Sequence, residues 1–384
     1  MKKLWFMVLL GMFVLWGCSS SSSDDTPTDD DTGITDDDGS TVTFDRGQML
    51  TNWADNIIIP AYSGFFTTYA DFQSAYDAFK IDRTVENLTN VRTTWLAAYK
   101  SWQRISMFEV GPAETAGLRL NVNTYPTDVE LLEEYVITGN YDFSLPSNRD
   151  VKGFPALDYL INGLADTDEA IITIYNTDTT GDAYLDYFED VTTDIETRVT
   201  DVLDEWNAEY RDTFVQNDGS SSTASVDRFV NDYIFYYEKF LRAGKMGIPL
   251  GVFSGTTAPQ TIEAFYQDGV SNELFLEGLD AVQDFFNGKH FGSATTGESL
   301  ATYLKTLNTV KDGEELDVLI NEQFNTARDG VSALDAFKTE IEENNPPTDM
   351  LLAYDEVQRI VPLMKVDMVS AMSISIDFVD ADGD

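Results

Sequence analysis

One periodicity runs through most of this chain, and it is that of an amphipathic α-helix. Between residues 85 and 105 the apolar side chains recur every three or four positions, at Val85, Leu88, Val91, Trp95, Tyr99, Trp102 and Ile105. This spacing forms an apolar stripe along about six helical turns. Similar stripes occupy residues 184–206, 229–240 and 316–341, and no comparable alternation of apolar and polar residues indicates a strand. We therefore predict an all-α fold.

Polar segments divide these helices. Thr84 can cap the first stripe and Gly111-Pro112 ends it, while Thr127 to Glu130 has the spacing of a capping box. The clearest break is the polar run at residues 216–222. Such a run between two long helical patterns is typical of a domain boundary. We predict an N-terminal helical half at residues 44–216 and a C-terminal helical bundle at residues 223–384.

The first 17 residues have the pattern of a secretory signal peptide. Lys2 and Lys3 precede an apolar run from Leu4 to Trp16 that is too short to span a bilayer comfortably. Leu15-Trp16-Gly17-Cys18 resembles a bacterial lipobox, so Cys18 is the predicted lipidation site, with an ordinary cleaved signal as the alternative. Because Cys18 is the only cysteine, the mature chain offers no internal disulfide and no thiolate cluster.

Residues 18–43 are predicted to be a lipidated cysteine followed by a disordered acidic tether. They contain eight Asp and neither Lys nor Arg. Acidic residues soon after a lipidated cysteine resemble a surface-export signal, although a plain periplasmic spacer has the same composition. Without the signal and the tether, the body of about 340 residues carries a formal charge near −37. This charge therefore disfavours nucleic acids and anionic membrane surfaces as partners of the body.

Several enzyme classes are excluded by what the sequence lacks. His290 is the only histidine, and it lies in a glycine-flanked segment that we predict to be a loop. The chain has no HExxH pattern, no GxSxG elbow and no phosphate-binding glycine loop. A catalytic triad would have to use His290, and we interpret this residue as a surface histidine.

The remaining candidates are carboxylates and aromatic residues of the first half. They are Glu109, Glu114, Arg119, Tyr125, Gly153, Pro155 and Asp158. Pro155 suits the start of a helix, where its missing N–H costs nothing. Asp158 then falls in or near the first turn, where a carboxylate is favoured by the helix dipole. A structural role and a ligand-binding role for Asp158 are both open at this point.

Five segments resemble imelysin-like proteins of the bacterial envelope. They are WLAAYKSWQRISMFEVGPAE (95–114), NVNTYPTD (121–128), GFPALD (153–158), LRAGKMGIPLG (241–251) and the tail at residues 365–384. The resemblance implies a helical fold of two halves related by duplication, an envelope-anchored or periplasmic location, and a link to iron or haem uptake. The founding member of the family was described as a peptidase.

The family motif GxHxxE is degenerate in this chain. Gly153 matches the glycine, Asp158 takes the place of the glutamate, and Pro155 replaces the histidine. A mechanism that requires the histidine is therefore in doubt, and no catalytic residue is assigned. The candidate metal ligands are Asp158, from the motif, and Glu109, from the carboxylates of the first half, for iron or another divalent or trivalent cation, because hard carboxylate oxygens suit such ions.

Three functions remain open. The first is a non-enzymatic lipoprotein that binds iron, another metal or haem for an envelope uptake partner, in a cleft lined by Glu109, Arg119 and Asp158. With one histidine, ligation of haem by two histidines of one chain is impossible. The second is a peptidase that uses a pair of carboxylates, and the third is an interaction or scaffold protein. In each case we expect a cell-envelope location, anchored to the outer membrane through Cys18, on its periplasmic or cell-surface face.

Overall fold

The computed structural model describes residues 34–35, 41–42, 44–267 and 269–377, and all of them belong to one unit of the chain, residues 33–384. The predicted signal peptide and Cys18 lie outside the described residues. Two short stretches of the predicted tether, β1 (Ile34–Thr35) and β2 (Thr41–Val42), pair as antiparallel strands. The rest of the predicted tether lies outside the described residues, so the disordered tether stays a prediction.

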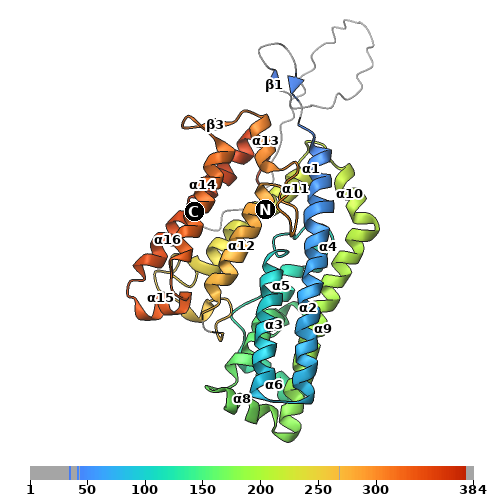
Figure 1. The fold of residues 1–384 in the computed structure, drawn as a ribbon, viewed down its shortest axis with the longest axis vertical. Coiled ribbons are helices and arrows are strands. Elements are labelled where there is room, and N and C mark those ends of the chain that lie inside the picture. The colour runs from blue at the N-terminus through green and yellow to red at the C-terminus, as the bar shows by residue number, and fades with distance from the viewer. Residues whose placement is uncertain (1–33, 36–40, 43, 268, 378–384) are drawn as a thin grey trace, which may run out of the picture. The chain divides into compact units, whose positions relative to one another are not determined.

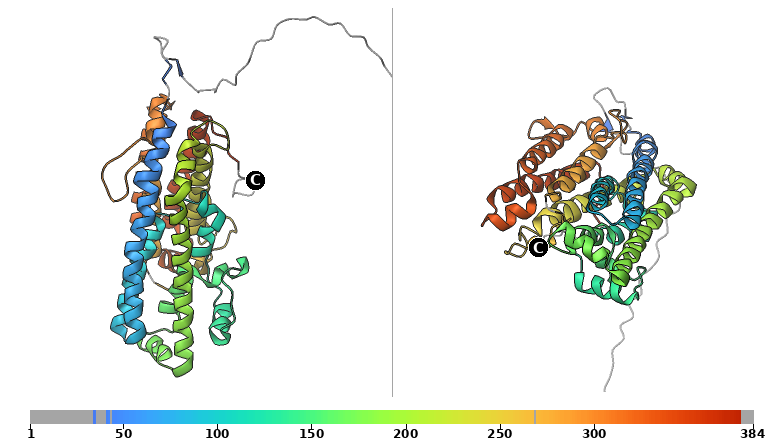
Figure 2. Two further views of the ribbon diagram at one scale, coloured as in Figure 1. Left: turned by 90° about the vertical axis from the view of Figure 1, so that its right-hand side faces the viewer. Right: turned by 60° about the horizontal axis from the view of Figure 1, so that its bottom comes forward.

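Three long helices dominate the N-terminal part (Figure 1): α2 (Ile59–Ile81), α3 (Val85–Gln103) and α9 (Asp178–Glu205). A short connection at residues 82–84 makes α2 and α3 an antiparallel pair. The left view of Figure 2 shows α2 and α9 running alongside each other. The shorter elements of this part are α1 (Arg46–Asn52), η1 (Trp53–Ile58), α4 (Pro112–Ala116), α5 (Leu118–Val122), α6 (Val129–Thr138), η2 (Pro146–Val151), α7 (Gly153–Asp158), η3 (Tyr159–Gly163), α8 (Asp168–Tyr175), η4 (Trp206–Tyr210) and α10 (Arg211–Gln216).

The C-terminal part is also built from helices. Its longer elements are α11 (Ser225–Phe235), η5 (Tyr236–Gly247), α12 (Ser271–Phe286), α14 (Leu316–Ser332) and α16 (Thr348–Gln358). The shorter ones are η6 (Pro259–Thr261), α13 (Leu300–Thr306), α15 (Phe337–Glu343), α17 (Ile360–Pro362), η7 (Leu363–Met368) and α18 (Val369–Ala371), with the small antiparallel pair β3 (Val310–Lys311) and β4 (Glu314–Glu315). The predicted all-α fold is confirmed. No helix of the described residues is long and apolar enough to cross a membrane.

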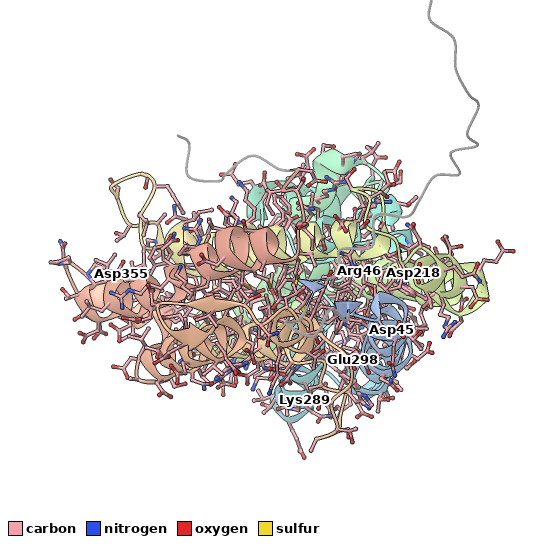
Figure 3. The ribbon with its side chains drawn as sticks, turned by 90° about the horizontal axis from the view of Figure 1, so that it is seen from above. Asp45, Arg46, Asp218, Lys289, Glu298 and Asp355 are labelled. Atoms are coloured by element: carbon pink, nitrogen blue, oxygen red, sulfur yellow. The ribbon has the colours of Figure 1, made fainter. Side chains whose placement is uncertain are left out.

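The loop predicted at residues 216–222 is present between α10 and α11. Buried residues from both sides of it form one continuous hydrophobic cluster, and α3 packs directly on α12 (Figure 1). Arg46, at the start of α1 and labelled in Figure 3, also links the two sides by hydrogen bonds. Its Nη2 donates to the Tyr303 hydroxyl at 2.8 Å and its Nη1 to the Gly219 carbonyl at 2.9 Å. The division at this loop and the internal duplication both stay predictions.

The helix ends follow the capping rules, with two corrections. Thr84 caps α3 by accepting from the Asn87 amide, as predicted. The cap of α6 is Asp128 and not Thr127, because the Asp128 side chain accepts from the Leu131 amide. The stripe at residues 316–341 is divided between α14 and α15, and the Asp335 amide in the break donates to the Glu340 side chain at 3.0 Å.

Candidate functional site

The motif glycine has a structural reason. Gly153 begins α7 with a φ of +77°, a conformation that side chains disfavour. A Cβ at this position would lie 2.1 Å from the Val122 carbonyl oxygen. Only glycine lets the start of α7 pack directly on the end of α5. The motif is thereby placed beside the segment that leads to Tyr125.

Asp158, predicted in or near the first turn, is the sixth and last residue of α7 and lies beyond that turn. The chain continues from it into the π-helical segment η3, where no helix start is available to favour a carboxylate. Pro155 is the third residue of α7, a place near the helix start as predicted, and it is buried.

Asp158 is instead held by three hydrogen bonds, two of which come from the C-terminal part. It is 1% exposed, and it accepts from the backbone amides of Tyr266 and Gln267 at 2.8 and 2.9 Å and from the Asn162 side chain at 2.9 Å. Burial raises the pKa of Asp158 to about 7, against the lowering effect of these hydrogen bonds and of Lys338. The carboxylate therefore fastens the loop at residues 264–267 to α7.

Pro155 and Asp158 line a small pocket of about 240 Å³, which we call the motif pocket. Its other walls include Tyr125, Gln260, Phe265 and Tyr266. The ammonium of Lys338 lies 4.4 Å from the centre of the Phe265 ring.

Glu109, Arg119 and Asp232 form a second, mostly buried cluster. Arg119 is 4% exposed; its Nη2 donates to Asp232 at 3.0 Å and its Nε to the Ser106 carbonyl at 2.7 Å. The Glu109 carboxylate accepts from the Arg119 backbone amide at 2.8 Å, while the Glu109 amide donates to Asp232 at 3.1 Å. The guanidinium also lies over the Phe240 ring, 4.6 Å from its centre.

Burial decides the ionisation of this cluster. It raises the pKa of Glu109 to about 7, against the opposite effect of Arg119, and it raises the pKa of Asp232. Burial lowers the pKa of Arg119, but Asp232 and Glu109 together hold that pKa above its usual value. Arg119 is therefore a permanent cation between two carboxyl groups.

Glu109, Glu114, Arg119 and Asp232 line a cleft of about 330 Å³, which we call the acidic pocket. Glu114 is half exposed and pairs with Arg228 at 2.5 Å.

The single cleft expected for Glu109, Arg119 and Asp158 is not formed, because Glu109 and Asp158 line different pockets. Within the described ranges, no group of three or more His, Cys, Asp or Glu side chains could hold a metal ion.

A third pocket, of about 350 Å³, shares lining residues with both of the others, and we call it the central pocket. It shares Arg119, Leu120 and Phe240 with the acidic pocket, and Tyr125 and Pro126 with the motif pocket. Its second wall is η5, which supplies Tyr236, Lys239, Phe240 and Lys245. Through Phe240, the π-helical segment η5 borders both the central and the acidic pocket, and such segments are frequent at functional sites.

A buried ion pair lies at the central pocket. Lys245, which lines the pocket, pairs with Glu263, and the two are 4% and 1% exposed. The other oxygen of Glu263 accepts from Asn123 at 2.7 Å, Tyr99 at 3.1 Å and Gln103 at 3.2 Å. Burial lowers the pKa of Lys245, and Glu263 opposes that shift.

Sequence reasoning missed Asp232, Lys245 and Glu263. Only Lys245 left a signal, as a cation among the glycine and apolar residues of 241–251. Nothing in the local sequence around Asp232 or Glu263 indicates their partners. The partners of Asp232 lie more than a hundred positions away, and those of Glu263 lie 18 positions away at Lys245 and more than a hundred away at Tyr99.

The largest cavity described lies elsewhere and contains the only histidine. It measures about 640 Å³ between α3, α12 and the loop at residues 289–294. His290 lies in this loop, as predicted, and lines the cavity. At the cavity wall Arg104 bridges α3 and α12 by pairing with Glu277 and, at 2.8 Å, with Asp284. Asp284 also pairs at 3.0 Å with Lys289, which is labelled in Figure 3.

Comparison with known proteins identifies the family. The family model described as imelysin matches residues 58–361, which is most of the chain. The matched range contains every residue that lines the motif, acidic and central pockets except Asp377. The chain belongs to the imelysin family. The assignment of Gly153, Pro155 and Asp158 to the positions of the GxHxxE motif stays a prediction.

Two solved structures share the imelysin fold with this chain. One is a protein described as an iron-regulated protein A precursor from Parabacteroides distasonis, with a TM-score of 0.68, 16% identity, and coverage of 89% of this chain and 98% of that one. The other is an imelysin-like protein from Psychrobacter arcticum, with a TM-score of 0.63, 17% identity, and coverage of 87% and 97%.

A curated relative is iron-regulated protein A of Synechococcus elongatus. It is 24% identical over 90 residues, which are 23% of this chain and 25% of the relative. The match therefore spans about a quarter of the relative's length.

Proposed function

We propose that this imelysin-family chain is a non-enzymatic lipoprotein of the cell envelope that binds iron or another metal, as a complex or as haem, for uptake. The proposal is supported by the family and by the name "iron-regulated" that its relatives carry. Cys18 is the proposed anchor to the outer membrane, and an envelope uptake system is the proposed partner.

The proposal that the protein is not an enzyme rests on the residues of the motif pocket. Pro155 has no ionisable group where the motif has histidine. The Asp158 carboxylate accepts three hydrogen bonds from Asn162, Tyr266 and Gln267. A general base must be free to take a proton from a reacting group or a water. An Asp158 held in this way favours a binding role over cleavage.

We propose that the acidic pocket contacts the metal complex. Glu109, Glu114 and Asp232 supply hard oxygen atoms, which suit ferric and divalent ions. Arg119 and Arg228 already balance part of this charge. Fewer than three metal-binding side chains converge here among the described residues. A bare ion would therefore need most of its ligands from another molecule, so a metal chelate fits the acidic pocket better than a bare ion. Asp158 is proposed to hold the neighbouring loop and not the metal.

Isothermal calorimetry of the full-length protein in detergent micelles tests the proposal. Ferric citrate, calcium and haem are titrated into the wild type, into Glu109→Gln with Glu114→Gln, and into Glu134→Gln. Glu134 is exposed and does not line the acidic pocket, so its variant is the matched control. We expect the double variant to bind the iron chelate about tenfold more weakly, because hydrogen bonds to charged groups are lost, and the control to be unchanged.

Other results would contradict parts of the proposal. Absence of binding of iron, calcium and haem would reject the binding role. Equal affinities of the double variant and the control would reject the acidic pocket. Haem binding that is lost only in His290→Ala would move the site to the cavity at residues 289–294. Cleavage of a peptide library that Asp158→Asn abolishes would favour a peptidase, and capture of one specific protein partner without a small ligand would favour a scaffold.

The anchor has its own test. Cells that express the chain are labelled with a radioactive fatty acid, and the protein is recovered from membrane fractions. Wild type is expected to carry the label in the outer membrane, and Cys18→Ser to carry none. Label that persists in Cys18→Ser would reject the lipidation site.

A further inference from the structure

We propose that the central pocket binds a small organic acid, a carboxylate on an aromatic or branched aliphatic body. This inference rests on the lining of the pocket and requires no metal. It therefore stands apart from the uptake role and is tested without iron.

The charge of the lining is the first argument. Arg119, Lys239 and Lys245 line the pocket, and no Asp or Glu does. The whole chain has 67 acidic and 24 basic residues. A wall with three cations and no acid is therefore unusual for this protein. It favours an anionic occupant over a cation or a bare metal ion.

The second argument is which of these cations have free donors. Arg119 is committed to Asp232 and to the Ser106 carbonyl. Lys239 is exposed, and its ammonium has no hydrogen-bond or salt-bridge partner among the described residues. An ammonium has three donors, and in the described part of the chain that of Lys245 is paired with Glu263 alone. Because Lys239 and Lys245 both line the central pocket, we expect one bound carboxylate to accept from both.

The third argument is the body of the ligand. Leu120, Tyr125, Pro126, Phe240 and Ile248 make the rest of the wall mostly apolar. A volume of about 350 Å³ falls in the range of small-molecule sites. An aromatic or branched aliphatic group would pack on these side chains, and a sugar or a polyphosphate would not.

A buried polar atom adds a preference. Gln103 lines the pocket and is fully buried, and its amide nitrogen donates to Glu263. Its Oε1 is without a hydrogen-bond partner among the described residues. Buried acceptors are normally paired. An acid that also carries an N–H or O–H donor would therefore bind more tightly than one without it.

The experiment uses three probes of nearly one shape and different charge. Ligand-observed NMR and calorimetry measure the binding of 3-phenylpropionate, the neutral 3-phenylpropionamide and the cationic 3-phenylpropylamine to the full-length protein in the absence of iron. We expect the acid to bind about tenfold more tightly than the amide, because charge-assisted hydrogen bonds are the stronger ones, and we expect the amine to bind least.

Two lysine variants locate the carboxylate. Lys239→Gln removes the exposed cation of the pocket, and Lys305→Gln removes an exposed cation that lies outside it and has no partner among the described residues. We expect the first to weaken binding of the acid about three- to fivefold, the size of an exposed charge pair, and the second to leave it unchanged. Both sites are exposed, so neither variant should impair folding.

A crystal soaked with 3-(4-bromophenyl)propionate then shows the body of the ligand. The bromine is expected between Leu120, Tyr125 and Phe240. The proposal is overturned if the amine binds as tightly as the acid, if Lys239→Gln and Lys305→Gln have equal affinities, or if the bromine lies in another cavity.

Discussion

Replacement of Gly153 by alanine tests how α7 is placed. Two costs are expected. The φ of +77° disfavours any side chain by about 1–2 kcal/mol. The new Cβ would also lie 2.1 Å from the Val122 carbonyl oxygen, well inside the 3.0 Å that real Cβ contacts respect. Moving packed backbone to relieve such an overlap costs about 1–3 kcal/mol more. The free energy of unfolding should therefore fall by about 2–5 kcal/mol.

Gly139 offers a matched control for this change. It ends α6 with a φ of +63°, and a Cβ there would have no atom within 4 Å. Gly139→Ala should therefore show the conformational cost alone, about 1–2 kcal/mol. Urea unfolding followed by the fluorescence of the buried tryptophans measures both variants. If the two substitutions cost the same within about 0.5 kcal/mol, the contact with Val122 does not constrain the motif and the reasoning is refuted.

Three further predictions concern single groups. The pKa of Asp158 is about 7 in the folded protein and near 4 in the unfolded chain, so the folded protein binds the extra proton between these values and its stability falls as pH rises through about 4 to 7. Asp158→Asn should therefore make the urea midpoint less dependent on pH. Parallel pH profiles of the variant and the wild type would contradict this. Arg119→Met should cost about 3–5 kcal/mol, because the mostly buried Asp232 carboxylate loses its cation, and adding Asp232→Asn should restore part of this stability in the same assay. A double variant no more stable than the single one would contradict the pairing. Asp128→Ala should cost about 1 kcal/mol of stability and Thr127→Ala much less, because Asp128 is the N-cap of α6. Thermal unfolding measures both variants, and the reverse order would show that Thr127 is the cap.

Local features were the most predictable from the sequence. The cap at Thr84 and the loop at residues 216–222 depend on residues a few positions apart, and the structure has both. The same local reasoning misplaced Asp158, because it assumed a helix start. The partners of Asp158 lie 108 and 109 positions along the chain, at Tyr266 and Gln267. No periodicity in the sequence encodes such a contact.

By itself, then, the sequence determined the helical fold, the family and the absence of a motif histidine, because each depends on residue type and short-range spacing. The tertiary structure decided which candidates meet. It placed Glu109 with Asp232 in one pocket and Asp158 in another, and it brought Lys245 and Glu263 together at the pocket between them. Burial then set the pKa values of Glu109 and Asp158, since desolvation depends on everything that packs around a carboxyl group and not on its neighbours in the chain.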